Sequence, residues 1–192
     1  QFDNLEINKK IVKVFRKIYP LLNNSMISEK KNKKIKIGFF SEFFSNHTIG
    51  KLFKGLIFKL DRSIFDITVF HSKNTKKTLI YNEFLESEIT LGTKNIILDK
   101  NFSDKINTIR NESLDIVFFP EIGMSTEFYY LTFLRIARIQ ITSWGHPITS
   151  ANESIDYFLS SNLLKGNNDK EIFSEKMIYL KHLPMYFYKP KI

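Results

Sequence analysis

The chain of 192 residues contains no cysteine. This absence excludes disulfide bonds, thiolate catalysis and zinc sites built from cysteine. No apolar run approaches the roughly 18 residues that a membrane-spanning helix needs. The N-terminal residues QFDNLEINKK also lack the apolar core of a signal peptide. We therefore expect a soluble, cytoplasmic protein with no membrane partner.

Glycine is scarce as well, with seven residues in the chain. A dinucleotide-binding Rossmann domain normally carries G-x-G-x-x-G directly after its first strand. In this chain Gly38 is followed by Phe39, Phe40, Ser41 and Glu42, and a Walker A loop is absent too. The sequence thus excludes a glycine-rich loop after the first strand that binds a pyrophosphate, and this argues against a dehydrogenase.

Clustered histidine and carboxylate residues with the spacing of metal ligands are also missing, so we expect no metal and no other cofactor. The formal net charge is +9, and a charge of this sign can serve a polyanion such as nucleic acid. The lysines are scattered, however, and the one dense run, Lys30–Lys36, is typical of a solvated linker. We expect no nucleic-acid partner. The positive potential instead helps to attract a phosphate-bearing ligand.

The pattern of apolar residues predicts an amphipathic helix followed by one α/β domain. The helix is Leu5–Leu22, with a stripe of Ile7, Ile11, Val12, Phe15, Ile18 and Tyr19. We expect this helix and a basic linker to occupy residues 1–32 and a Rossmann-like domain to occupy residues 33–192. The expected strands are Ile35–Phe40, Phe65–His71, Asn95–Leu98, Leu114–Phe119, Ile139–Ser143 and Ile155–Ser160. The expected helices contain Leu52–Leu60 and span Leu79–Leu91, Phe102–Asn111 and Glu127–Ala137. This alternation predicts a doubly wound, mostly parallel sheet.

A polar loop, Ser41–Thr48, joins the first strand to the following helix and carries His47. In open α/β sheets, ligands bind in the crevice beyond the carboxyl ends of the strands. A histidine at this place can titrate near neutral pH and act as a catalytic base. Its neighbours Asn46 and Thr48 are candidate caps of the helix. The alternative is that His47 is an ordinary exposed loop residue.

A second loop, Ser143–Ser150, follows a strand on the same rim and contains the only tryptophan, Trp144. Gly145 permits a close approach of the backbone, and His146 can donate to a hydroxyl or phosphate oxygen. The alternative is a rigid turn in which Trp144 fills the core.

Two further polar residues come at strand ends. Glu121 follows an apolar strand in the loop Phe119–Ser125 and can orient a substrate hydroxyl, unless this loop is only a connection. His71 ends the second strand, where its side chain either faces the crevice or is half-buried.

Four segments together resemble the catalytic region of the protein O-GlcNAc transferases, the family-41 glycosyltransferases, which are often fused to tetratricopeptide repeats. In order, they are KIKIGFFSEFFSNHTIGKL, DIVFFPEIGM, RIQITSWGHPITS and IDYFLSS. The resemblance continues through EIFSEKMIYLKHLP and covers residues 33–189. It implies a GT-B architecture of two Rossmann-like halves, of which this chain is the first. The N-terminal helix would then connect to preceding repeats.

The same resemblance implies a set of site residues. The family motif S-D-F-x-N-H aligns with Ser41–His47, although Glu42 replaces the aspartate and one extra residue is present. This alignment makes His47 the catalytic residue that accepts or steers the acceptor's proton. The block G-H-P-x-T-S implies a loop near the acceptor and the donor phosphates. The expected substrate-binding residues are Asn46, Thr48, Glu121, Gly145, His146, Pro147, Thr149 and Ser150.

The activity implied is the inverting transfer of GlcNAc from UDP-GlcNAc to serine or threonine hydroxyls of an acceptor protein. A relative that uses UDP-glucose or modifies asparagine is a close alternative, and a non-catalytic peptide-binding module is a more distant one. In this family the second half mainly holds the donor. We therefore expect the uridine- and diphosphate-binding residues to lie outside this chain, and the isolated chain to be inactive.

Overall fold

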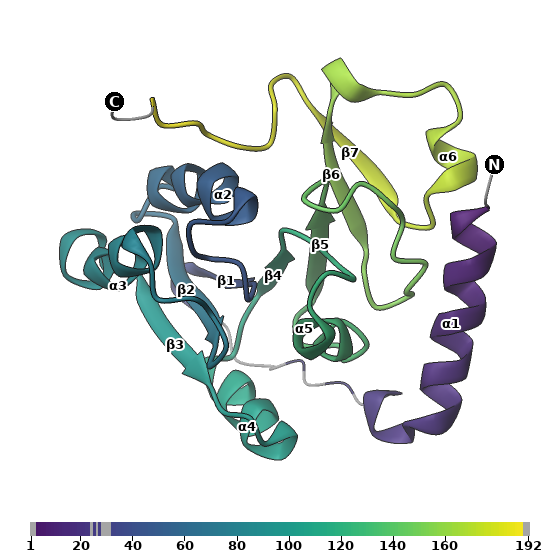
Figure 1. The fold of residues 1–192 in the computed structure, drawn as a ribbon, viewed down its shortest axis with the longest axis horizontal. Coiled ribbons are helices and arrows are strands. Elements are labelled where there is room, and N and C mark those ends of the chain that lie inside the picture. The colour runs from purple at the N-terminus through teal and green to yellow at the C-terminus, as the bar shows by residue number, and fades with distance from the viewer. Residues whose placement is uncertain (1–2, 24, 26, 28–31, 190–192) are drawn as a thin grey trace.

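The computed structural model describes residues 3–23, 25, 27 and 32–189, so part of the predicted basic linker lies outside the described residues. Its centre is a sheet of seven parallel strands in the order β3-β2-β1-β4-β5-β6-β7 (Figure 1). The strands are β1 (Ile35–Phe40), β2 (Phe65–Ser72), β3 (Lys94–Leu98), β4 (Ile116–Phe119), β5 (Ile139–Ser143), β6 (Tyr157–Ser161) and β7 (Lys176–Leu180). The predicted fold class, a doubly wound and mostly parallel Rossmann-like sheet, is confirmed.

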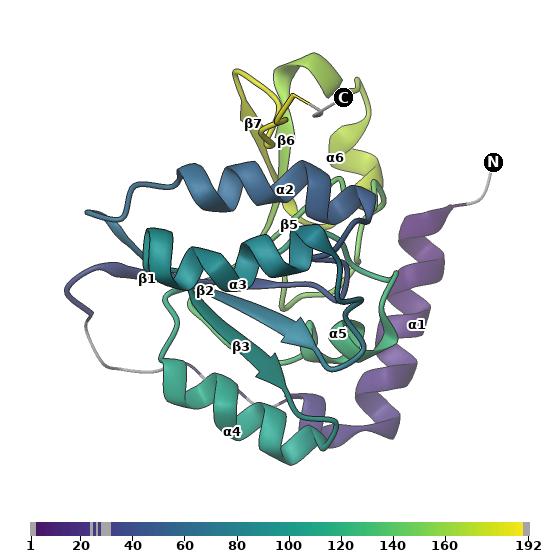
Figure 2. The same ribbon diagram turned by 60° about the vertical axis from the view of Figure 1, so that its left-hand side comes forward.

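Helices cover both faces of the sheet (Figure 2). The helices are α1 (Asn4–Ile18), α2 (Thr48–Lys59), α3 (Leu79–Leu91), α4 (Phe102–Glu112), α5 (Thr126–Leu131) and α6 (Asp169–Ile172), with 3₁₀ turns at Pro20–Asn23 and Asn162–Leu164. The two cores follow the alternation of β1: Phe39 belongs to the core under α2 and α3, and Phe40 to the core that includes α4 and α5. The strand order reverses between β1 and β4, which makes the carboxyl ends of these strands the expected binding crevice.

Helix α1 ends four residues before the predicted end, at Ile18. Pro20 explains the difference, because proline disfavours a helical conformation in the residue before it and cannot donate to the helix. Val12 is buried in the same core cluster as the sheet, and Phe15 packs against that cluster. Other members of the predicted apolar stripe are exposed, namely Ile7, Ile11, Ile18 and Tyr19.

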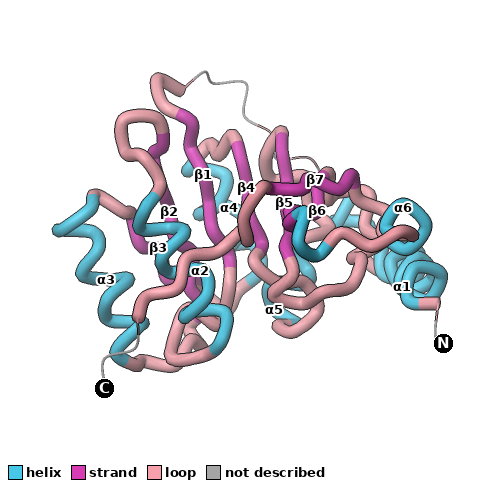
Figure 3. The backbone as a smooth tube through the Cα atoms, turned by 90° about the horizontal axis from the view of Figure 1, so that it is seen from above, coloured by secondary structure: helices cyan, strands magenta, loops and turns pink. Residues whose placement is uncertain are grey.

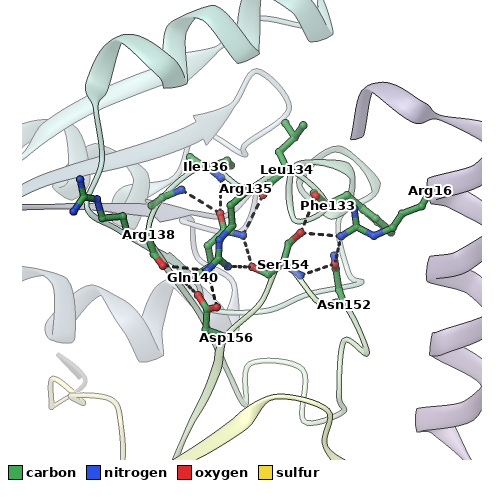
Figure 4. A network of polar contacts seen from close by, with 11 residues as sticks. Arg16, Phe133, Leu134, Arg135, Ile136, Arg138, Gln140, Asn152, Ser154 and Asp156 are labelled. Carbon is green, nitrogen blue, oxygen red and sulfur yellow. Dashed lines mark hydrogen bonds and ion pairs between the residues drawn. The ribbon is translucent and has the colours of Figure 1, made fainter. Parts of the chain in front are cut away.

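The side chain of Arg16 fixes α1 to the loop between β5 and β6 (Figure 4). Its guanidinium group donates to Oδ1 of Asn152 at 2.9 Å and to Oγ of Ser154 at 2.8 Å. The same group lies over the ring of Phe133, 5.5 Å from the ring centroid. Helix α1 therefore packs closely on the α/β domain, and the predicted boundary between residues 1–32 and 33–192 stays a prediction.

Helix α5 is much shorter than predicted, because it ends at Leu131 and not at Ala137. The cause is Gln140, a completely buried side chain in β5 (Figure 4). Its Oε1 accepts from the backbone N–H of Ile136 at 2.7 Å, and its Nε2 donates to the carbonyl oxygen of Leu134 at 3.1 Å. These backbone groups are bound by a side chain instead of by helical partners. The prediction of a helix over 127–137 was wrong from residue 132 onwards.

The last strand, β7, has no counterpart among the predicted elements. It pairs in parallel with β6 at the edge of the sheet, and the chain after it runs back towards α2 (Figure 3). There the N–H of Tyr186 lies 3.4 Å from the carbonyl oxygen of Leu52. None of the helices in the described part of the chain has the length and apolarity needed to cross a membrane.

His71 proves to be a core residue and neither faces the crevice nor is half-buried. Its side chain is completely buried among the rings of Phe44, Tyr81 and Phe84. Nε2 lies 2.9 Å from Oδ1 of Asn95, whose amide nitrogen donates to the carbonyl oxygen of Phe84. Oδ1 is therefore an acceptor and Nε2 a donor. Nδ1 is left without a partner among the described residues, so a second proton on this ring would have no acceptor.

We expect the stability of the chain to fall in mild acid because of His71. Burial lowers the pKa of His71 from 6.5 to about 4, against the opposing effect of the hydrogen bond that its Nε2 donates to Asn95. The unfolded chain thus takes up the proton at a higher pH than the folded chain does. The free energy of unfolding then decreases as the pH falls from 6.5 to 4, by at most about 3 kcal/mol.

The variant His71→Gln tests this expectation, because glutamine keeps a donor for Asn95 but does not titrate. Urea denaturation at several pH values should show a variant that is less stable than the wild type at pH 7 but loses less stability between pH 6.5 and 4. Equal losses in the two proteins would contradict the assignment.

Candidate active site

The histidine of the first loop, His47, is the N-cap of α2. Its Nδ1 accepts a hydrogen bond from the backbone N–H of Ile49 at 3.2 Å, and its ring lies over Phe43 with centroids 4.6 Å apart. An N–H group can only donate, so Nδ1 must carry the lone pair. The neutral ring consequently holds its proton on Nε2. The expectation that Asn46 or Thr48 caps this helix was wrong, because His47 itself occupies the capping position.

Asn46 instead joins the loop to the start of α3. Its Oδ1 accepts from the N–H of Ile80 at 3.1 Å, and its own N–H donates to Oγ1 of Thr78 at 2.9 Å. Thr48 is the first residue of α2 and is exposed. The loop after β1 thus contacts the N-termini of two helices. His47 caps α2, and Asn46 binds the start of α3.

A cavity of about 180 Å³ lies beside this loop. It includes His47 and Asn46 together with side chains from the loop after β2, so it lies on the β1–β2 side of the sheet edge. The lining residues are Glu42, Phe43, Ser45, Asn46, His47, Asn74, Lys76 and Thr78.

Glu121, which follows β4, is 2 % exposed. Its Oε1 accepts from the hydroxyl of Ser41 at 3.3 Å and its Oε2 from the N–H of Met124 at 3.4 Å. Burial raises the pKa of Glu121, the nearby charge of Glu42 adds to the rise and the two hydrogen bonds oppose it, so that the pKa is about 8. Glu121 is therefore mainly a neutral acid at pH 7 that joins the ends of β1 and β4. Its role in substrate binding stays a prediction.

The loop after β5 is held close to the loop after β4. The N–H of Gly145 donates to the carbonyl oxygen of Pro120 at 3.1 Å, and a Cβ at Gly145 would lie only 2.5 Å from that oxygen. It would also lie 2.6 Å from Cδ1 of Ile49, the residue whose N–H binds His47. Any side chain here would force these segments apart. The two predicted histidine loops thus meet at Ile49.

The ring of His146 is half-buried, and its Nδ1 lies 2.6 Å from the carbonyl oxygen of Ile122. The neighbouring Pro147 is exposed. Trp144 is half-buried, and its Nε1 is enclosed without a hydrogen-bond partner among the described residues. In this loop the His146 ring is therefore held by a hydrogen bond to Ile122, while the next residue, Pro147, is exposed.

Sequence reasoning missed Glu175, the buried carboxylate that anchors the same loop. Its Oε2 accepts from the hydroxyl of Thr149 at 2.7 Å, and its Oε1 accepts from the N–H of Ser150 at 2.8 Å and from the Ser150 hydroxyl. The oxygen atoms of Thr149 and Ser150 are thus engaged inside the protein. The segment EIFSEKMIYLKHLP contained Glu175, but nothing in the sequence pairs this residue with Ser150, 25 positions earlier.

A larger cavity, of about 360 Å³, lies between α1, α5 and the loop after β5. The structure therefore places the two candidate histidines in different cavities, although their loops touch. The lining residues are Asn8, Ile11, Phe15, Ile122, Gly123, Thr126, Tyr129, Tyr130, His146, Ile148, Thr149 and Ser150.

No group of three or more histidine and carboxylate side chains in the described ranges is arranged to hold a metal ion. The expectation that the protein needs no metal or cofactor stays a prediction.

Comparisons with known proteins agree with this architecture. The model of glycosyl transferase family 41 matches residues 3–188. A structure of a mutant O-GlcNAc transferase from Thermobaculum terrenum matches the fold with a TM-score of 0.70 at 15 % sequence identity. The match covers 92 % of this chain and 34 % of that structure, so the chain spans about a third of its length. No curated protein sequence matches the chain significantly. The chain belongs to glycosyl transferase family 41.

We expect the variant Glu121→Gln to become more stable than the wild type as the pH rises. The pKa of Glu121 is raised from 4.5 to about 8 in the folded chain, so the folded chain binds this proton more tightly than the unfolded chain does. The free energy of unfolding therefore falls as the pH rises from 4.5 to 8, by at most roughly 5 kcal/mol, and glutamine removes this loss. Urea denaturation at pH 5, 6.5 and 8 measures the difference. A difference that does not change with pH would refute the buried, protonated state.

A second prediction concerns Glu175. Replacement by alanine leaves several buried donors without an acceptor and should lower the free energy of unfolding by roughly 3 kcal/mol. Glu175→Gln keeps a carbonyl acceptor and should lose about half as much. Urea denaturation gives both values, and the fluorescence of Trp144, the only tryptophan, reports on the loop itself. An unchanged emission spectrum in the alanine variant would show that Glu175 does not hold this loop.

Proposed function

We propose that the chain is the N-terminal part of a glycosyltransferase that transfers GlcNAc from UDP-GlcNAc to serine or threonine hydroxyls of proteins, with inversion at the sugar carbon. The observation that carries this proposal is the match of the family-41 model over residues 3–188. The fold supports it, because the loops that carry the candidate residues lie where open α/β sheets bind their ligands.

The donor, in this proposal, is held mainly by residues outside the chain. The match to only 34 % of the Thermobaculum terrenum structure supports this division. Within the chain, the absence of a glycine-rich turn after β1 agrees with it, since Gly38 lies inside the strand. The isolated chain is therefore expected neither to bind UDP tightly nor to transfer sugar.

His47 is the proposed catalytic residue of the first loop. A protein hydroxyl is a poor nucleophile until a base removes its proton as the new bond forms. The bond from Ile49 to Nδ1 leaves the neutral His47 ring with Nε2–H, which is able to donate a hydrogen bond to a substrate. We therefore propose that His47 orients the substrate as a donor, and that its role as proton acceptor is the weaker alternative.

The second loop supplies the other proposed substrate contacts. His146 and Gly123 line the larger cavity, which is bounded by the aromatic side chains of Tyr129 and Tyr130. A peptide segment with a hydroxyl side chain fits a cavity that combines aromatic walls and a few polar groups. Thr149 and Ser150 support this site through Glu175 and contribute to its wall.

The test uses the full-length protein that contains this chain, incubated with labelled UDP-GlcNAc or UDP-glucose and protein acceptors. We expect GlcNAc on serine or threonine, as found by mass spectrometry, and no transfer by the isolated chain. Calorimetry of the isolated chain should show no micromolar affinity for UDP. Glucose on asparagine would favour the N-glucosyltransferase alternative. Peptide binding without any transfer would favour the interaction module.

A further inference from the structure

The two loop histidines are held by hydrogen bonds of opposite kind. His47 receives an N–H from Ile49 at Nδ1, at 3.2 Å. His146 faces the carbonyl oxygen of Ile122 with its Nδ1, at 2.6 Å. A carbonyl oxygen has no proton to give, so Nδ1 of His146 must be the donor. The backbone thus selects the Nε2–H form of His47 and the Nδ1–H form of His146.

This difference decides which ring can take up a proton at Nε2. In neutral His146 the lone pair is on Nε2. In neutral His47, Nε2 already carries the hydrogen. If this hydrogen moved to Nδ1, the Nδ1–H of His47 and the backbone N–H of Ile49 would point at each other. His47 can therefore accept a proton at Nε2 only after losing its cap of α2. His146 can accept one with its existing hydrogen bond intact.

The loop around His146 is held at several points, so its ring has a defined direction. Gly145 before it is bound to Pro120, and the N–H of Ile148 after it donates to the His146 carbonyl oxygen at 2.9 Å. Gly123 lies against the ring with a φ of 102°, where a Cβ would come within 3.3 Å of Nδ1. A base that is held before the substrate arrives loses little entropy in the reaction.

We propose that His146, and not His47, is the catalytic residue that accepts the proton of the acceptor hydroxyl. This role rests on the proposed function. The hydroxyl oxygen attacks C1 of the sugar, and its proton passes to Nε2 of His146. The bond between C1 and the phosphate oxygen breaks, and its electron pair leaves with UDP. The resulting imidazolium keeps its Nδ1–H bond to Ile122, and it returns its extra proton to water before the next turnover.

The ring forms can be measured without any activity. Two-bond ¹H–¹⁵N correlation spectra of the chain, at a pH where the imidazoles are neutral, show which ring nitrogen carries hydrogen. The chain has four histidines, so single variants assign each signal. We expect His146 in the Nδ1–H form and His47 in the Nε2–H form, with His71 as an internal Nε2–H reference. An Nε2–H form of His146 would overturn the proposal.

Turnover by the full-length protein tests the chemistry. His146→Asn keeps a donor near the position of Nδ1 but removes the base, and it should lower kcat at least about 100-fold. His47→Gln keeps a donor near the position of Nε2 and should lose much less. His182→Asn is the matched control, because His182 is exposed and its replacement should leave kcat unchanged. Calorimetric affinity for UDP should be the same in the three variants.

The opposite ranking, with a 100-fold loss in His47→Gln and near-normal turnover in His146→Asn, would assign the base to His47 and overturn the proposal. A wild-type protein that transfers no sugar would overturn the proposed function and this role with it, while the tautomers found by NMR would stand. The two failures are thus distinguishable.

Discussion

Parallel pairing of β1 with β4 is the constraint on which the candidate site depends. Ile37 pairs with Ile116 and Phe39 with Phe118, so the two strands end at the same edge of the sheet. The other strands lie on either side of this pair: β2 and β3 lie beyond β1, and β5, β6 and β7 lie beyond β4. Because β1 and β4 are not consecutive in sequence, their carboxyl ends mark the place where open α/β sheets bind ligands. The loops that follow them are joined there by hydrogen bonds from Ser41 to Glu121 and from Ser125 to Glu42. The pairing of β4 with β5 adds the His146 loop to the same edge.

The loops at this edge take their shape from buried polar side chains. Glu121 and Glu175 each bind backbone or hydroxyl groups of a loop at this edge from inside the protein, and Gln140 does the same for the segment that precedes β5. An unsatisfied buried donor costs about 1–3 kcal/mol, so each of these side chains stabilises one loop conformation over its alternatives. As a result, the conformation of each loop depends on residues that are distant in sequence. A substitution at Glu175, for example, acts on the candidate site through Thr149 and Ser150.

This dependence explains which parts were predictable from sequence. The helix Leu79–Leu91 and the strand Ile139–Ser143 have their predicted bounds, because the period of their apolar residues matches the structure that they form. The helix after Ser125 was predicted too long, since the apolar pattern around Ile136 does not reveal that Gln140 binds its backbone. Strand β7 was missed because it is only five residues long, and a short apolar run such as Met177–Leu180 does not by itself identify a strand.

In the candidate site, the positions of the residues could be predicted from sequence, whereas their protonation could not. Strand ends located His47, Glu121 and His146 in the right loops, since a short polar segment after an apolar strand marks the sheet edge. The protonation state of each group could not be predicted from the sequence, because it depends on a partner from another segment of the chain. Glu121 is neutral because the fold buries it, and the two histidines differ because one meets an N–H and the other a carbonyl group.

The choice of a carbonyl partner for His146 has a chemical consequence. A carboxylate at Nδ1 would orient the ring and also add a full negative charge that favours the imidazolium. The carbonyl oxygen of Ile122 orients the ring in the same way but brings only a dipole. Glu121, whose pKa is raised to about 8 by burial, carries little charge near neutral pH, and the carboxylate of Glu42 accepts from the hydroxyl of Ser125. In the proposed reaction, the carbonyl oxygen of Ile122 would therefore fix the direction in which His146 accepts the proton, without placing a full negative charge at Nδ1.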